Sequence, residues 1–171
     1  RLFWICALLL ILIVAGGGCG FISATLSNLP DVSNVRPSAS SQIYDVHGNL
    51  ITTVHSTENR LPVPLKDVPK DLQNAFVATE DSRFYSHHGI DPVGILRAVW
   101  VNIVHSGVSE GGSTITQQLA RNAFLSQDRT FKRKISEALL ALKIEQHYTK
   151  DEILEMYMNQ IYFGQGAYGV Q

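Results

Sequence analysis

Residues 78–89 read ATEDSRFYSHHG and set two adjacent carboxylates, Glu80 and Asp81, among arginine, histidine and aromatic side chains. Leu72, Phe76 and Glu80 follow at four-residue steps, so on a helix all three occupy one face. A carboxylate on an apolar face loses solvation, which favours its neutral form and suits it to general acid or base work. Asp81 points about 100° away from that face and is expected to stay solvated.

The same stretch also fits an ordinary helix end. In this interpretation Glu80 pairs with Arg83 or His87. The helix would run from Pro69 to Arg83, and Gly89 would close the segment. Charged side chains near helix ends are common, so this stretch alone favours an ion pair over catalysis.

The chain around this stretch is expected to be mainly helical. Apolar residues on both sides of residues 45–49 predict a short β-hairpin, and the prolines that follow exclude a helix or central strand before residue 70. Further helices are predicted at 93–104 after Asp91 and Pro92, at 115–124 after Ser113 or Thr114, at 134–148, and at 150–159 after a Thr149–Glu152 capping box. Glycines at 164, 166 and 169 then break the pattern.

The N-terminal segment is apolar enough to enter a membrane. No charged residue occurs between Arg1 and Asp31, and residues 2–22 read LFWICALLLILIVAGGGCGFI. A helix of about 20 residues spans a hydrocarbon core. A signal peptide cleaved after small residues is the alternative. Because the apolar stretch continues past its glycines, we expect an uncleaved anchor at 1–22, followed by a linker at 23–41.

Composition excludes several other classes of protein. The net charge of −1 provides no basic field for nucleic acid. Both cysteines, Cys6 and Cys19, lie in the N-terminal segment, so the rest of the chain has no disulfide framework and no cysteine metal site. The histidines lack the H-E-x-x-H spacing of a zinc protease.

The apolar run 93–104 is too short to span a bilayer, and is either a buried core helix or a monotopic membrane contact.

Two downstream stretches carry groups that suit phosphate chemistry. Residues 110–122, EGGSTITQQLARN, join glycines and hydroxyls to a helix start, where free backbone N–H groups bind anions. Arg133 and Lys134 precede Glu137 by four and three positions, so each can pair with it on a helix. Helix capping and a surface ion pair worth at most about 1 kcal/mol explain the same residues equally well.

Taken together, the motifs resemble the ordered signatures of the peptidoglycan glycosyltransferases (glycosyltransferase family 51). EDSRFYSHHG at 80–89 resembles the first signature, GGSTITQQLARN at 111–122 the second, RKISE at 133–137 the third and KDEILEMYMNQIYFG at 150–164 the fourth. Met158 stands where the family usually has Leu. The resemblance implies a mainly α, lysozyme-like helical domain with a small β-hairpin near its start. This domain would occupy residues 42–171, continue past them, and be preceded by one transmembrane helix.

The resemblance also implies a role for each site residue. Glu80 would be the general base that takes the proton from the acceptor sugar hydroxyl, with Asp81 as a supporting carboxylate. Glu137 would help to organise the donor diphosphate. The remaining residues would line or neutralise the diphosphate site, and they are Ser113, Thr114, Gln118, Arg121, Arg129, Arg133 and Lys134.

The implied reaction is polymerisation of lipid II onto the growing glycan strand, with inversion at the anomeric carbon. The implied location is the outer face of the bacterial cytoplasmic membrane, in contact with that membrane and with other cell-wall synthesis proteins. Some family members use a divalent cation such as Mg²⁺ or Mn²⁺, for which this sequence shows no dedicated cage. No organic cofactor is implied.

Other functions remain as alternatives. The hairpin and the long linker favour a bifunctional class A penicillin-binding protein over a monofunctional transglycosylase. A lysozyme-like, glycan-cleaving enzyme would also use a lone glutamate, but it needs neither the basic motif nor the membrane anchor. A non-catalytic scaffold gives no reason for both Glu80 and Glu137.

Overall fold

The computed structural model describes residues 20, 23–33, 41–54, 62–105, 111–126, 128, 130–165 and 167–170. The chain divides into two compact units, Arg1–Asp31 and Val32–Gln171. In the first unit residues 23–27 are helical. Most of the predicted anchor, residues 1–19 and 21–22, lies outside the described residues. None of the helices that the structure describes combines the length and the apolar character needed to cross a membrane.

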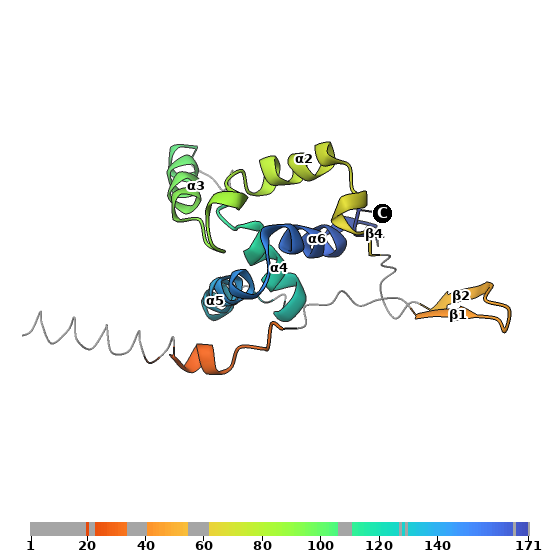
Figure 1. Cartoon of the computed structure of the whole chain (residues 1–171). Coiled ribbons are helices and arrows are strands. Elements are labelled where there is room, and N and C mark those ends of the chain that lie inside the picture. The colour runs from red at the N-terminus through yellow and green to blue at the C-terminus, as the bar shows by residue number, and fades with distance from the viewer. Residues whose placement is uncertain are drawn as a thin grey trace, which may run out of the picture. The chain divides into compact units, whose positions relative to one another are not determined.

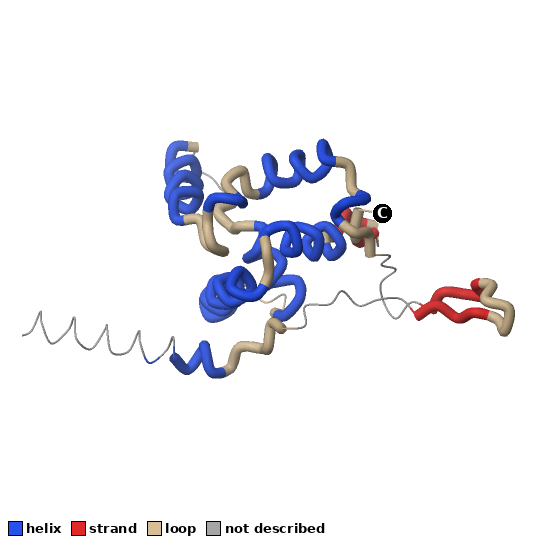
Figure 2. Tube along the Cα trace, viewed as in Figure 1, coloured by secondary structure: helices blue, strands red, loops and turns tan. Residues whose placement is uncertain are grey.

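The second unit is mainly helical, as the sequence predicts (Figure 1, Figure 2). Its elements are β1 (Ser41–Tyr44), β2 (Leu50–Val54), η1 (Leu65–Asp67), α2 (Lys70–Glu80), η2 (Phe84–Ser86), α3 (Pro92–Val104), α4 (Ile115–Phe124), α5 (Phe131–His147), α6 (Lys150–Gln160), β3 (Tyr162–Gly164) and β4 (Ala167–Tyr168). β1 pairs with β2 and β3 with β4, both antiparallel. The predicted hairpin near the start of the domain is confirmed, whereas the β3–β4 hairpin was not predicted.

The turn of the first hairpin is stabilised by one carboxylate. Asp45 accepts hydrogen bonds from the backbone N–H groups of His47 and Asn49 and from the Asn49 side chain, each at 2.8 Å. These bonds, above all the one from the Asn49 side chain, lower the pKa of Asp45. Gly48 completes the turn with φ +83°, a conformation that costs glycine little.

Helices α4, α5 and α6 form the core, and Figure 1 shows them gathered together. Apolar residues recur on each helix at three- or four-residue steps, so one face of each helix turns inward. The fully buried members are Ile115, Leu119, Leu140, Ile144, Ile153, Leu154, Tyr157 and Met158. By contrast, α2 buries Gln73 and α3 buries Gly94 and Ala98, while their other residues are at least partly exposed.

Threonines start the three core helices. Thr114 forms a capping box with Gln117 at the start of α4, and Thr149 forms one with Glu152 at the start of α6. Thr130 accepts a hydrogen bond from a backbone N–H one turn into α5. Each cap provides a hydrogen-bond acceptor for backbone N–H groups that would otherwise lack partners. Loss of an N-cap side chain typically lowers the stability of the fold by about 1 kcal/mol. The predicted cap near residue 114 and the predicted box at residue 149 are confirmed.

The segment before α2 is fastened to α6. Asn159 exchanges two hydrogen bonds with the backbone of Val63, and Glu155 accepts from the Leu65 N–H at 2.7 Å. The buried Gln73 side chain then donates to the Leu65 carbonyl at 2.9 Å. These bonds hold the first turn of α2 close to the core, although most of that helix is exposed.

Helix α2 ends at Glu80, three residues before the predicted end at Arg83. Asp81 leaves the helix with φ −160° and ψ 75°. Its carboxylate turns inward and accepts from the backbone N–H of Ile115 at 3.1 Å. The helix stops early because another helical turn would carry Asp81 away from this bond. Gly89 closes the segment as predicted, with φ +87°.

Replacing Gly89 with Ala is expected to destabilise the fold by about 2–4 kcal/mol. Gly89 has a left-handed backbone, and a Cβ there would lie 2.8 Å from the Ala141 carbonyl oxygen on α5. The Gly89 carbonyl also accepts the Thr114 hydroxyl at 2.6 Å, which restrains the backbone from moving aside. The loss of stability is measured by chemical denaturation, with unfolding monitored by circular dichroism.

Gly48→Ala is the matched control for this variant. Gly48 has φ +83°, but no atom lies within 4 Å of the Cβ that alanine would add. We therefore expect a loss of about 1 kcal/mol, the cost of the left-handed backbone alone. Equal losses for the two variants would contradict a tight junction at Gly89.

Candidate active site

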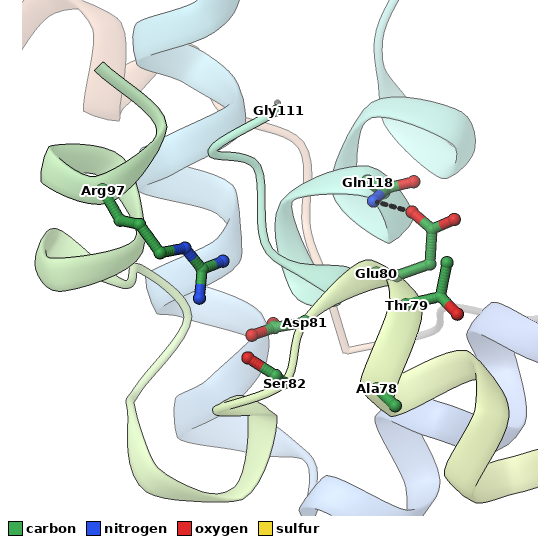
Figure 3. A pocket seen from close by; sticks show the side chains of 8 residues that line it. All are labelled: Ala78, Thr79, Glu80, Asp81, Ser82, Arg97, Gly111 and Gln118. Atoms are coloured by element: carbon green, nitrogen blue, oxygen red, sulfur yellow. Dashed lines mark hydrogen bonds between the residues drawn. The ribbon is translucent and has the colours of Figure 1, made fainter. Parts of the chain in front are cut away.

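Glu80 ends α2 and opens onto two hollows in the surface. One is a cavity of about 260 Å³ (Figure 3), lined by Ala78, Thr79, Glu80, Asp81, Ser82, Arg97, Gly111 and Gln118. The other is an apolar groove of about 240 Å³, lined by Leu72, Ala75, Phe76, Thr79 and Glu80. The Glu80 carboxylate is therefore accessible to a ligand in either hollow.

Glu80 lies on the predicted face of α2, but that face is open to solvent. Leu72 is 38% exposed and Glu80 is itself exposed. The expectation of a buried, desolvated carboxylate is therefore wrong. Glu80 is instead held by a hydrogen bond, because Gln118 Nε2 donates to Glu80 Oε2 at 2.9 Å, the dashed line in Figure 3.

Asp81 points away from solvent and is buried, so the expectation that it stays solvated is wrong. Its Oδ1 and Oδ2 each lie 3.0 Å from His87 Nε2, and Oδ2 also accepts from the Ile115 N–H at 3.1 Å. Asp81 borders the cavity, yet both of its oxygens are engaged by the protein. Its geometry therefore suits it to position the stretch that carries Glu80.

The neighbours that the ion-pair interpretation assigned to Glu80 are engaged with other carboxylates. Arg83 Nε donates to Asp91 Oδ2 at 3.0 Å, and a second guanidinium nitrogen contacts the same carboxylate. His87 contacts Asp81. The ion-pair interpretation of Glu80 is therefore wrong.

The predicted cap of α3 is wrong in part. Asp91 directly precedes the helix, as predicted, but its side chain makes no capping hydrogen bond.

A second carboxylate, Glu137, is fully buried on α5 between two cations. Arg133 Nη1 donates to Glu137 Oε2 at 3.0 Å, and Lys134 Nζ donates to Glu137 Oε1 at 2.5 Å. Lys134 Nζ also donates to Ser113 Oγ at 2.7 Å, immediately before α4. The predicted pairs are confirmed, and they form a partly buried network rather than a pair on the surface. Within the described residues, Arg133 Nε is buried without a hydrogen-bond partner.

The other predicted site residues differ in what they contact. Thr114 is 2% exposed, caps α4 and donates to the Gly89 carbonyl, so the fold already uses its hydroxyl. Arg121 lies half-buried on α4, and its charge acts on Tyr157. Arg129 lies outside the described residues.

Two further residues, one lining the cavity and one in contact with its lining, were not singled out by the sequence. Tyr157 on α6 donates from its hydroxyl to Gln118 Oε1 at 3.3 Å. Arg97 on α3 lines the cavity, and Figure 3 shows it reaching toward Asp81. Arg97 interrupts the apolar run 93–104, which is a usable signal. Nothing near Tyr157 in the sequence signals a contact with a residue 39 positions away.

The carboxylates of the site do not fit a resident divalent cation. In the described part of the chain, no three His, Cys, Asp or Glu side chains come together as a metal-binding group. Both Glu137 oxygens are occupied by Arg133 and Lys134, and both Asp81 oxygens lie against His87. A cation such as Mg²⁺ or Mn²⁺ stays a prediction.

Comparison with known proteins identifies the class of enzyme. The family model described as transglycosylase matches residues 47–171. The chain is 51% identical to penicillin-binding protein 1A of Escherichia coli (strain K12) over 173 residues, which cover 99% of this chain and 20% of that protein. It is 53% identical to penicillin-binding protein 1F of Bacillus subtilis (strain 168) over 133 residues, which cover 78% of this chain and 18% of that protein.

The chain therefore belongs to the transglycosylase family. It matches the transglycosylase part of penicillin-binding proteins of the 1A type, so its enzyme class is that of the peptidoglycan glycosyltransferases. The assignment made from the four motifs is confirmed. The chain spans about a fifth of the length of the curated relatives it matches.

Proposed function

We propose that this domain polymerises lipid II, a disaccharide-pentapeptide on a polyprenyl diphosphate, into glycan strands. The observation that carries the proposal is the pair of contacts made at the start of α4. Ser113 accepts from the cation Lys134, and Gln118, five positions later, donates to Glu80. One short stretch thus holds both a candidate base and a candidate diphosphate-binding cation.

In the proposed mechanism the reacting sugar lies between these two groups. Glu80 accepts the proton of the acceptor hydroxyl as that oxygen attacks the anomeric carbon of the donor. The bond from the same carbon to the diphosphate oxygen breaks, the anomeric centre inverts, and polyprenyl diphosphate leaves with the bonding electrons. Lys134 and Arg133 stabilise the negative charge that develops on the leaving group.

Glu137 supports this mechanism by fixing the two cations before substrate arrives. It is fully buried, and its contacts with Lys134 and Arg133 hold both side chains in place. Groups that are already oriented need little reorganisation when charge develops in the transition state. The Lys134 side chain remains 45% exposed, which leaves it accessible to an anionic ligand. We therefore assign Glu137 the organisation of the diphosphate site.

We also propose that α3 lies in the membrane surface. Leu96, Trp100 and Ile103 follow at four- and three-residue steps and are 69%, 68% and 68% exposed. The structure thus leaves the run 93–104 largely unburied, and the core-helix alternative is wrong for the described residues. A helix with one wide apolar face binds at the lipid–water interface. The polyprenyl chain of lipid II would be held in the same membrane.

In a protein restricted to the unit Val32–Gln171, replacing Leu96 and Ile103 with Ser together is expected to lower partitioning onto anionic lipid vesicles on the order of tenfold or more, because each buried Leu or Ile side chain contributes about 1.5–3 kcal/mol. Trp100 reports the contact, because it is the only Trp in the compact unit Val32–Gln171. Its fluorescence should shift to shorter wavelength when vesicles bind. Val46→Ser, at an exposed residue in the β1–β2 turn, is the control and should leave partitioning unchanged.

The activity itself is tested with the full-length protein and labelled lipid II. Polymer formation is the expected result, and release of soluble fragments from purified cell-wall sacculi would instead indicate a glycan-cleaving enzyme. The two cations held by the buried Glu137 support the transferase, because hydrolysis of a glycan has no diphosphate to neutralise.

The cellular setting is part of the same proposal. We propose a single N-terminal span, a catalytic domain on the outer face of the bacterial cytoplasmic membrane, and other cell-wall synthesis proteins as partners. The apolar segment 2–22 and the lipid-linked substrate support this location. The relatives are penicillin-binding proteins, so we also propose a transpeptidase domain elsewhere in the full-length protein. Labelling that protein with fluorescent penicillin tests the last point.

A further inference from the structure

The Glu80 carboxylate is linked through one amide to a tyrosine in the core. Gln118 Nε2 donates to Glu80 Oε2 at 2.9 Å, and Gln118 Oε1 accepts from the Tyr157 hydroxyl at 3.3 Å. The three side chains come from α2, α4 and α6. The link therefore joins an exposed helix end to the centre of the domain.

The chemistry of these groups allows one arrangement of protons. An ionised carboxylate only accepts hydrogen bonds, whereas an amide donates from nitrogen and accepts at oxygen. Gln118 must then turn its nitrogen toward Glu80 and its oxygen toward Tyr157, and the tyrosine hydroxyl must donate. The opposite orientation of the amide would set two acceptors against each other with no proton between them.

Tyr157 is suited to act as a fixed donor. It is 1% exposed, and its ring packs edge-to-face against Phe76 with the ring centres 6.2 Å apart. Burial and, to a smaller extent, the Glu80 charge raise the pKa of Tyr157 well above its ordinary value, while the Arg121 charge partly opposes them. The hydroxyl therefore keeps its proton over the whole physiological pH range.

We propose that Tyr157 is a positioning residue, which holds the Gln118 amide in the orientation that donates to Glu80. The base is exposed at a helix end, so this link keeps its carboxylate oxygen in one place relative to the acceptor hydroxyl. The inference rests on the proposed function, in which Glu80 is the base. It assigns Tyr157 no contact with substrate.

The test is Tyr157→Phe in the full-length protein, assayed with fluorescent lipid II. The contact is long for two oxygens, so we expect kcat to fall by about three- to tenfold with KM little changed. Tyr148→Phe is the matched control, because its hydroxyl donates to the Val32 carbonyl, outside the site, and kcat should not change.

A double-mutant comparison separates positioning from packing. If Tyr157 acts through the amide, adding Tyr157→Phe to Gln118→Ala should cause no further loss of kcat. A double variant whose loss of kcat is the product of the two single losses, or a Tyr157→Phe protein with normal kcat, would overturn the positioning role. Glu80→Gln in the same assay keeps the two proposals apart. Activity in that variant would refute the base itself, whereas inactivity alongside normal Tyr157→Phe would refute only the positioning.

Discussion

Glu80→Gln is expected to abolish lipid II polymerisation while the domain stays folded. A positioned general base contributes about 10²–10⁴-fold to a rate, and the amide cannot accept the proton of the acceptor hydroxyl. Glutamine has the same shape as glutamate. In the parent protein Gln118 Nε2 donates to Glu80 Oε2 at 2.9 Å, and the side-chain oxygen of a glutamine at this position can accept the same hydrogen bond. Initial rates of consumption of labelled lipid II measure the effect.

Two comparisons make the result specific for Glu80. Thermal unfolding of the variant should match that of the parent protein, because Glu80 is exposed and contributes little to packing. Asp71→Asn removes another exposed carboxylate at the opposite end of the same helix and should leave the rate within a factor of about two. Retained polymerisation by Glu80→Gln would remove Glu80 from the role of base.

Lys134→Ala is expected to lower the polymerisation rate by about 10²–10³-fold, the range seen when one preorganised group that stabilises transition-state charge is removed. Lys134 is the exposed cation of the Glu137 network, and in the proposed mechanism it faces the leaving diphosphate. The loss should appear in kcat, because the charge on the leaving oxygen grows only as the bond breaks. Steady-state rates across lipid II concentrations measure it.

The same variant is also expected to be less stable, and the two effects have to be separated. Removing Lys134 leaves the buried Glu137 with Arg133 as its remaining cation, and breaking a buried pair costs about 3–5 kcal/mol. Adding Glu137→Gln should restore stability without restoring the rate. Lys132→Ala, at an exposed lysine on the same helix, is the control for net charge. Near-normal turnover by Lys134→Ala would argue against diphosphate binding at this position.

The parts of the fold that local chemistry decides were predicted from the sequence. Thr149 and Glu152 lie one turn apart and satisfy each other's backbone, so the start of α6 needs no distant partner. Arg133 and Glu137 meet because four residues separate them on a helix. The end of α2 was missed because it depends on a hydrogen bond that Asp81 accepts from a backbone N–H 34 positions away.

The sequence predicted the position of Glu80 on its helix but not the surroundings of its carboxylate. The spacing of Glu80 correctly placed it beside Leu72 and Phe76, but spacing cannot show whether another element covers that face. The structure leaves the face open, so solvation and a hydrogen bond from Gln118 set the surroundings of the carboxylate. The sequence did not single out Tyr157, because apolar and aromatic residues repeated at four-residue steps along a helix are ordinary core residues.

Adjacent carboxylates at positions 80 and 81 have opposite surroundings, and this affects how a mutational scan of the domain would be interpreted. Asp81 fastens the end of one helix to the first turn of another through Ile115, next to the proposed base. A scan scored by activity alone would mark both acids as essential. A parallel measurement of protein abundance would separate the two. We expect substitution of Asp81 to lower abundance, because it breaks a contact between two helices, whereas substitution of Glu80 should lower activity at normal abundance.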